Sequence, residues 1–574
     1  MSHKGGRPKD PIWDSFIITA GKAQCNNCLT LVSKKADRMK SHLIKCLKAP
    51  SVPPSSQSPD VIVVSTSAGE KRPACEDDAA PPPKRQKPDN TQPSVSKLFV
   101  RTTHDHKQKL DEKCAELIYA ANLPFSLVEH PAFRSFVSAL RPGYTPPAAK
   151  TISSKLLDQT HEKLQDTMKQ TLTGKTVTVQ QDGWSDIHNR PVVASCLNVQ
   201  GKPYLLEAED SKHNTKNAEY YREKVVQSID KAENQYGCKV SSCVTDSAKN
   251  MVNMRAALEK ERPDIITYPC GAHNMNLLGQ DITPKSVVKH VVEVNKYFRN
   301  HHKPSSLLHD MPGSVAPQLP GDTRWNSQRN SVASYIKNRP NMISVVQNHP
   351  EEFDQHIINK IMDLNLFRKA KDLLDQLKPV AIGLNKVQAD DATIADSCDI
   401  YLKLMEEDAL KPHAAAVEKR FKEAIQSVHF AAHLLHPVYQ GRGQSDEQKE
   451  SAKAWVTARD PTFLILTMAF QVKSAPFHLP SFFLPEVLGD EATKIKGVNT
   501  ITWWKALAAS VSLPPKFLDL MLQLHDASAS SASMERIFSR FGLTQTKLRN
   551  RLCTDKLQKL AFCHQMLRDP DYNV

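Results

Sequence analysis

The segments KTVTVQQ (175–181), PVVASCLNV (191–199) and PYLLEAED (203–210) decide the fold class of this chain. Each is rich in β-branched or aromatic residues, and turn-forming residues separate them, a pattern that predicts three strands of an antiparallel meander. A helical segment at 216–237 follows and closes with Gly237, because glycine favours the left-handed conformation that ends many helices. The sequence therefore predicts a meander that leads directly into a helix.

Helices and strands alternate in the next part of the chain. The pattern predicts strands at 239–247 and 265–270 and helices at 250–261 and 271–282. Three meander strands followed by alternating helices and strands form the element order of a ribonuclease H-like fold. The sequence thus predicts an α/β protein with this fold, in which the first and fourth strands are neighbours.

Two acidic residues follow these neighbouring strands. Asp182 is expected to close the first strand, with Gly183 letting the chain turn away, and Asp246 is expected to close the fourth. Two carboxylates that face each other are costly unless divalent cations lie between them, which is the requirement for two-metal phosphoryl transfer. A strand-end aspartate also serves as a turn or helix cap, and that structural alternative stays open here.

Composition indicates a nucleic-acid partner and no membrane. The chain has 574 residues, enough for several domains, and a formal net charge of +14, which favours a polyanionic partner, although a merely basic protein shows the same excess. No run of about eighteen apolar residues occurs, and MSHKGGRPKD (1–10) lacks the apolar segment of a secretory signal. We expect a soluble intracellular protein whose 12 cysteines are mostly isolated thiols in a reducing compartment.

A linker with a nuclear-import pattern follows the first 49 residues. Residues 50–104 contain a stretch rich in Pro, Ser and acidic residues that cannot bury enough apolar surface to fold. Two basic clusters lie within it, Lys71–Arg72 and Lys84, Arg85 and Lys87. Their spacing is typical of a bipartite import signal, although a solvated charge run in a linker has the same composition. The sequence predicts a nuclear protein.

The N-terminal segment, 1–49, carries four metal-type ligands. Cys25, Cys28, His42 and Cys46 give C-x2-C, a spacer of thirteen residues and H-x3-C. Thiolate and imidazole ligands at these intervals suit a closed tetrahedral Zn²⁺ site, and so small a domain needs the metal to fold. The sequence therefore predicts a structural zinc finger.

The expected helix between the ligand pairs is basic. It carries four cationic side chains that can enter a major groove and contact phosphates or base edges: Lys34, Lys35, Arg38 and Lys40. We predict double-stranded DNA as the partner of this finger.

Four motifs in order carry a family resemblance. They are CVTDSAKNM (243–251), CGAHNMNLLGQD (270–281), GDTRWN (321–326) and SSASMERIFS (530–539). Together they resemble the hAT superfamily of cut-and-paste DNA transposases. With Trp13 and Phe16 ahead of Cys25, the N-terminal module resembles a BED-type finger, which commonly precedes hAT cores, although the final ligand is Cys46 where His is more usual.

The resemblance implies a third catalytic acid. In that family a long helical insertion interrupts the ribonuclease H-like core, and the last acid follows it within the motif that Glu535 matches here. Asp182, Asp246 and Glu535 would then form a DDE triad that binds two Mg²⁺ or Mn²⁺ ions. Without the family, Glu535 is an acid that complements the positive end of a helix.

The resemblance also assigns DNA contacts. His273 would touch a phosphate or the metal shell, although a core histidine beside a buried Cys270 is the alternative. Arg324 would hold a phosphate and Trp325 would stack on an unpaired base, although a core tryptophan with a surface arginine is equally consistent with the sequence. Trp503 and Trp504 match a tandem pair whose simplest role is core packing.

The resulting layout has four parts after the linker. They are a helical region at 105–174, the first part of the core at 175–284, an all-helical insertion at 285–510, and the end of the core with a C-terminal dimerisation region at 511–574. Four residues of the last part form an apolar face that packs either within the core or against a partner: Leu557, Leu560, Ala561 and Met566. The resemblance implies a homo-oligomer, at least a dimer.

Two functional readings remain. The first is a nuclear zinc-finger transposase that cuts and joins DNA by metal-dependent phosphoryl transfer. The second is a domesticated derivative, a DNA-binding transcriptional regulator that keeps the fold and the finger without cleaving DNA. The presence of all three acids, Asp182, Asp246 and Glu535, favours the enzyme. A ribonuclease H-like nuclease without joining activity would explain the acids but not the finger and the insertion.

Overall fold

The computed structural model describes two compact units, Met1–Gln92 and Pro93–Val574. The described residues are 15–19, 22–26, 28, 30–33, 39, 42, 102–185, 190–211, 217–321, 326–489, 495–544 and 552–568. The expected import signal at 71–87 and almost all of the expected linker lie outside these residues.

The first unit contains a small antiparallel sheet. Its strands are β1 (Phe16–Thr19), β2 (Lys22–Cys25) and β3 (Leu31–Ser33), paired in that order. Its hydrophobic cluster is formed by Phe16, Ala23, Cys25 and Met39. Among the described residues of this unit these four apolar side chains are buried, and so small a cluster favours a further stabilising element such as a metal.

Helices precede the main sheet of the second unit. They are α2 (His104–Ala120), η3 (Phe125–Glu129), α3 (Pro131–Leu140), α4 (Ala149–Thr151), η4 (Ile152–Leu156) and α5 (Leu157–Leu172). Thr103 caps α2 by accepting a hydrogen bond from the His106 amide, and Pro131 stands at the first position of α3, where its missing N–H costs nothing. Within the helical region expected at 105–174, a π-helical turn, η4, precedes regular α5.

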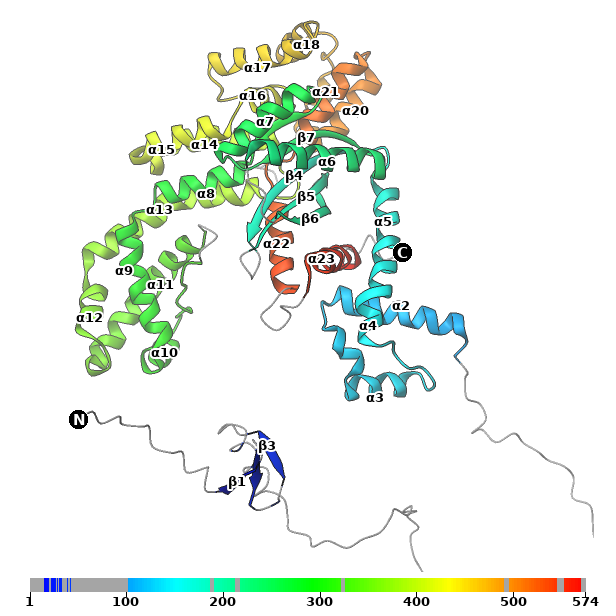
Figure 1. The fold of residues 1–574 in the computed structure, drawn as a ribbon. Helices are drawn as coiled ribbons and strands as arrows, with labels where there is room; N and C mark the ends of the chain where they lie inside the picture. The colour runs from blue at the N-terminus through cyan, green and yellow to red at the C-terminus, as the bar shows by residue number, and fades with distance from the viewer. Residues whose placement is uncertain are drawn as a thin grey trace, which may run out of the picture. The chain divides into compact units, whose positions relative to one another are not determined.

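A five-stranded mixed sheet forms the centre of the second unit (Figure 1). The elements are β4 (Thr176–Ser185), β5 (Pro191–Val199), β6 (Lys202–Asp210), α6 (Ala218–Tyr236), β7 (Lys239–Thr245), α7 (Lys249–Glu261), β8 (Ile266–Pro269) and α8 (Gly271–Asp281). The strand order is β6-β5-β4-β7-β8. β4, β5 and β6 form the expected antiparallel meander, whereas β4–β7 and β7–β8 pair in parallel. Gly237 caps α6 with a φ of 64°, as its position predicted.

The chain from α9 to α21 is helical. The elements are α9 (Lys285–Asn300), α10 (His302–His309), α11 (Asn326–Asn348), η5 (Pro350–Glu352), α12 (Gln355–Met362), α13 (Leu364–Val387), α14 (Ile394–Glu406), η6 (Asp408–His413), α15 (Ala414–Ala424), α16 (Ser427–Leu434), α17 (Asp446–Arg459), α18 (Phe463–Gln471), η7 (Pro480–Phe483), α19 (Pro485–Leu488), α20 (Thr500–Ser510) and α21 (Pro515–Asp526). Trp503 and Trp504 are almost completely buried in this region and pack edge to face, so core packing is their role. Among the described residues, no helix combines the length and the apolar character that crossing a membrane requires.

Two C-terminal helices return to the sheet. α22 (Ala532–Thr544) contacts β4, and α23 (Thr554–Arg568) packs against α2, α5 and β6. Leu557, Leu560, Ala561 and Met566 are all buried in the core of this same chain. Of the two alternatives for this apolar face, the structure therefore shows packing within the core, and the face is not free to bind a partner.

Candidate functional site

Asp182 lies on β4, and Asp246 directly follows β7, the parallel neighbour of β4. The last residue pair of the β4–β7 register is Gln180 with Val244. Asp182 lies two residues after Gln180, and Asp246 lies two residues after Val244. Because β4 and β7 run in parallel, both aspartates lie at the same end of the sheet. Residues two apart on a strand share a face, which gives Asp182 the same orientation as Gln180.

The strand that carries Asp182 does not end there. β4 continues to Ser185, with Asp182 paired to Ala194, Gly183 to Val193 and Trp184 to Val192. The expectation that the strand closes at Asp182 and turns away at Gly183 is therefore wrong, because pairing with β5 extends β4 beyond its last partner on β7. Asp182 thus stands on a rigid strand, and its Oδ1 accepts a hydrogen bond of 2.7 Å from the Gly183 amide.

Asp246 lies in a turn that neighbouring side chains hold. Its Oδ1 accepts a hydrogen bond of 2.9 Å from the Ala248 amide. The buried Arg255 of α7 donates from Nη1 to Thr245 Oγ1 and to the Asp246 carbonyl, both at 2.6 Å. Asn274 of α8 donates from Nδ2 to Ser247 Oγ at 2.8 Å. α7 therefore holds the Asp246 carbonyl and the Thr245 hydroxyl, and α8 holds the Ser247 hydroxyl on the other side of this carboxylate.

Glu535 reaches the site because two contacts bind α22 to β4. Gln180 Nε2 donates to the Ser530 carbonyl at 2.9 Å, and Gln180 Oε1 accepts from Ser533 Oγ. Trp184 packs on Phe538 with ring centroids 4.1 Å apart. Asp182 lies between Gln180 and Trp184 on the strand, and Glu535 lies between Ser533 and Phe538 on the helix. The contacts therefore bracket the acid pair from both sides.

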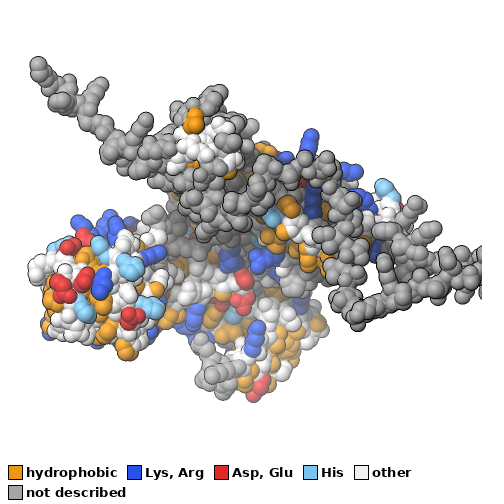
Figure 2. All heavy atoms as spheres, turned by 90° about the horizontal axis from the view of Figure 1, so that it is seen from below, with side chains coloured by type: hydrophobic (Ala, Val, Ile, Leu, Met, Phe, Trp, Pro, Cys, Tyr) orange, Lys and Arg blue, Asp and Glu red, His pale blue; other side chains and the backbone are white. Residues whose placement is uncertain are grey.

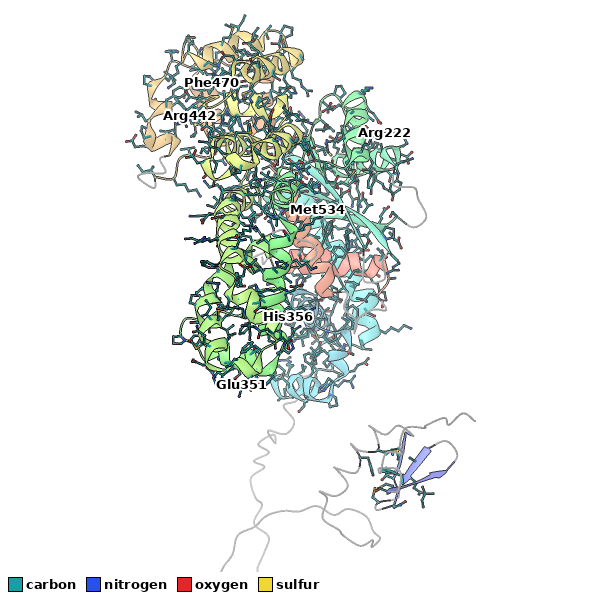
Figure 3. The ribbon with its side chains drawn as sticks, turned by 90° about the vertical axis from the view of Figure 1, so that its left-hand side faces the viewer. Arg222, Glu351, His356, Arg442, Phe470 and Met534 are labelled. Atoms are coloured by element: carbon teal, nitrogen blue, oxygen red, sulfur yellow. The ribbon has the colours of Figure 1, made fainter. Side chains whose placement is uncertain are left out.

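Figure 3 shows the position of this helix in the second unit. Met534, which directly precedes Glu535, lies where α22 meets the sheet, and its side chain is fully buried. Glu535 follows in the first turn of α22 and is half-buried. Because Met534 is buried, α22 cannot rotate about its axis, and the side chain of Glu535 leaves the helix in a fixed direction.

The electrostatics of Asp182 show that the three acids interact. Its side chain keeps some solvent contact, yet burial of the carboxyl raises its pKa from 3.8 to about 7. The hydrogen bond from the Gly183 amide opposes this rise, and the negative charges of Asp246 and Glu535 add to it. Bringing the third carboxylate to this end of the sheet thus has an electrostatic cost.

The donor set fits hard divalent cations. All three side chains offer carboxylate oxygens, the ligands that Mg²⁺ and Mn²⁺ prefer. The ligand atoms of the three acids do not all lie within 4.8 Å of one another, since only one group of three among the described residues meets that limit and it lies elsewhere. A site for two ions about 3.5–4 Å apart tolerates a wider spacing of its carboxylates.

Cys270 and His273 lie beside the acids, but Cys270 has a structural role. Its Sγ accepts hydrogen bonds of 3.4 Å from the His273 and Ser531 amides, so it caps α8 and joins it to the segment before α22. Burial raises the pKa of the Cys270 thiol, which disfavours the thiolate form that binds metals. His273 is half-buried on the first turn of α8, and its contact with phosphate or metal stays a prediction.

Sequence reasoning missed the residues that support the acids. Gln180, Arg255, Asn274 and Ser533 are polar and buried, and none stands in a pattern that indicates burial. Asp281, for which no role is predicted, accepts a hydrogen bond of 2.7 Å from Arg420 Nε in an ion pair. A buried amide or guanidinium becomes recognisable only when its partners, often hundreds of residues away, are known.

The first unit brings together three of the expected zinc ligands. The ligand atoms of Cys25, Cys28 and His42 all lie within 4.8 Å of one another, and Cys28 Sγ lies 3.1 Å from His42 Nε2. Two thiols and an imidazole at this spacing form a possible Cys2His metal site. Cys46, the expected fourth ligand, lies outside the described residues.

Six of the expected DNA contacts also lie outside the described residues. They are Lys34, Lys35, Arg38, Lys40, Arg324 and Trp325. Their roles stay predictions.

Part of the chain matches a known protein family. Residues 147–297 match the family described as Domain of unknown function (DUF659), a domain found in hAT-family transposase-like proteins. The match covers α5, the whole central sheet, α8 and most of α9, and it includes Asp182, Asp246 and His273. No curated protein shows significant similarity to the chain. The match thus supports a relationship to hAT-like transposases in the segment that holds two of the three acids.

Proposed function

We propose that this protein is a hAT-like DNA transposase that cuts and joins DNA by two-metal phosphoryl transfer. The observation that carries the proposal is the meeting of Asp182, Asp246 and Glu535 at one end of two parallel strands, with the pKa of Asp182 raised by burial and by its two acidic neighbours. The similarity of residues 147–297 to DUF659 supports the family, and the strand order β6-β5-β4-β7-β8 supports a ribonuclease H-like core.

Each acid has a part in this proposal. Asp182, Asp246 and Glu535 would hold two Mg²⁺ or Mn²⁺ ions. When bound, such ions supply an activated water or 3′-hydroxyl nucleophile and stabilise the leaving oxygen. Arg255 holds the Asp246 carbonyl, and Asn274 holds the hydroxyl of the neighbouring Ser247. His273, near the start of α8, would contact a phosphate.

The rest of the chain would deliver the DNA. Cys25, Cys28, His42 and Cys46 would bind Zn²⁺ and fold the finger, which would bind double-stranded DNA. The net charge of +14 supports a polyanionic partner, and a nuclear location stays part of the proposal. A homo-oligomer stays part of the proposal, but the apolar face of α23 cannot form its interface because that face is buried within the chain.

Excision of a marked DNA segment tests the proposal. The segment is bounded by the sequences that flank the reading frame, and the wild type is compared with Glu535→Gln. The matched control is Glu351→Gln. Glu351 is an exposed glutamate of η5 and lies away from Met534 in Figure 3. We expect excision by the wild type and the control and none by Glu535→Gln. Absence of excision by all three, with zinc-dependent DNA binding retained, would instead identify a regulator without cleavage activity.

A further inference from the structure

A row of lysines lies along one face of α9. Lys285, Lys289 and Lys296 are exposed and line a groove of about 470 Å³ together with Gln280, Thr283 and Gln328. At 3.6 residues per turn these lysines fall within an arc of about 40°, and they span about 16 Å along the helix axis. We call these three residues the α9 lysine row.

The opposite face of α9 fixes the direction of the row. Val287, Val291, Val294 and Phe298 are buried in the core, and Asn295 Nδ2 donates to the Ser331 carbonyl of α11 at 2.9 Å. The helix therefore cannot rotate without breaking its packing. The lysine side chains are held toward solvent as a fixed array of positive charge.

One carboxylate in the groove offsets part of this array. Glu293 forms an ion pair with Lys360 of α12, and the hydrogen bond and charge of Lys360 and, more weakly, the charge of Lys289 lower its pKa, so three lysines face a single acid that is already paired. Across the part of the chain that the structure describes, no ion pair involves Lys285, Lys289 or Lys296. The row thus keeps most of its positive charge for a partner.

The row lies on a path that starts at the acids. α8 begins directly after β8, beside Asp246, and runs away from the sheet; α9 follows after three residues (Figure 1). Gln328, across the groove, stands on the first turn of α11. Figure 2 shows the helical lobe of α9–α12 from below, where Lys and Arg side chains lie among Asp, Glu and His side chains.

We propose that the α9 lysine row binds the phosphate backbone of the double-stranded DNA that leads to the acid site. The proposal rests on the transposase function proposed above. The phosphates of one strand are spaced about 3.4 Å along the duplex axis, so a row of about 16 Å spans roughly five of them. Lysine is a point charge on a flexible stem, which suits phosphate contact without sequence readout.

The test is the salt dependence of DNA binding by the full chain. Affinity for a fluorescent mixed-sequence duplex is measured by anisotropy, without added Mg²⁺, over a series of salt concentrations. The variant replaces Lys285, Lys289 and Lys296 with Gln. The charge-matched control replaces Lys449, Lys505 and Lys516, on α17, α20 and α21, which lie at the top of Figure 1 away from α9.

We expect the slope of log affinity against log salt to be shallower by about 2.7 in the variant, since each lost phosphate contact removes about 0.9. The ratio of wild-type to variant affinity should then fall about 40-fold between about 50 and about 200 mM salt. The control should keep the wild-type slope. An unchanged slope in the variant, or an equal loss in the control, would overturn the proposal.

The measurement separates this inference from the proposed function. Binding is read without cleavage, so a chain that never excises DNA can still show the expected slope change. Conversely, a chain that excises DNA with an unchanged slope would refute the α9 lysine row and leave the transposase function intact. The substituted lysines are exposed except Lys449, which is half-buried, and thermal unfolding checks that each variant is folded.

Discussion

Replacing Asp182 with Asn should stabilise the protein while abolishing its activity. The substitution keeps an oxygen for the Gly183 amide and removes the charge that burial and the neighbouring Asp246 and Glu535 disfavour. The pKa of Asp182 rises from 3.8 to about 7, a difference equivalent to about 4 kcal/mol at about 1.4 kcal/mol per unit. Because solvent screens the half-buried carboxyl, we discount the expected gain to about 2 kcal/mol.

The gain depends on pH in a defined direction. At pH values above the folded pKa of about 7, Asp182 is ionised in the folded and unfolded chains, and the folded state bears the full cost. As the pH falls from 7 toward 3.8, the folded carboxyl takes up a proton first and the cost disappears. The difference between Asp182→Asn and the wild type should therefore be greatest near pH 8 and shrink toward pH 4.

Thermal unfolding without divalent cations measures the effect. For a unit of this size a change of 1 kcal/mol shifts the midpoint by about 1 °C, so we expect a rise of about 2 °C near pH 8. Added Mg²⁺ should stabilise the wild type more than the variant and so close the gap. The exposed Asp391→Asn serves as the control. A variant that is less stable than the wild type near pH 8 without cations would refute the reasoning.

Three further predictions concern the supporting residues. Gln180→Leu removes the partner of Ser533 Oγ and one of the two hydrogen bonds to the Ser530 carbonyl, which keeps its bond from Ser528 Oγ; the change should cost about 1–3 kcal/mol in urea unfolding and lower excision. Arg255→Met removes the hydrogen bonds of 2.6 Å to Thr245 Oγ1 and to the Asp246 carbonyl, so excision should need a higher Mg²⁺ concentration. A Mg²⁺ titration of excision measures this, and an unaltered Mg²⁺ dependence would contradict the role of Arg255 in positioning Asp246. Cys28→Ser, or zinc chelation, should abolish DNA binding by the finger, measured by anisotropy. The main unfolding transition of the second unit, measured by calorimetry, should stay unchanged.

The sheet could be predicted from the sequence because its signals are local. β-branched runs, turn residues and Gly237 each act over a few neighbouring residues, and they gave the strands of the meander and the end of α6. The end of β4 could not be predicted in this way. Asp182, Gly183 and Trp184 look like a turn, and they are extended only because β5 pairs with them.

The supporting contacts of the site could not be predicted because they join distant parts of the chain. Gln180 and Ser533 are separated by 353 residues, and neither has a neighbour that indicates burial. The apolar face of α23 posed a similar problem, since Leu557 and Leu560 suit a core or a dimer equally well. Only the position of α2, α5 and β6 decides between them.

The contacts that bracket Asp182 and Glu535 explain how the site tolerates its own repulsion. Without cations, the negative charges of the acids favour movement of α22 away from β4. Two contacts of different chemistry oppose that movement, the hydrogen bonds of Gln180 at one side and the packing of Trp184 on Phe538 at the other. Since the strand and the helix are both rigid over these few residues, holding them at two points fixes the spacing of the acids between them. The carboxylates are thus preorganised before any cation arrives, and the cost of that arrangement is distributed over the surrounding core.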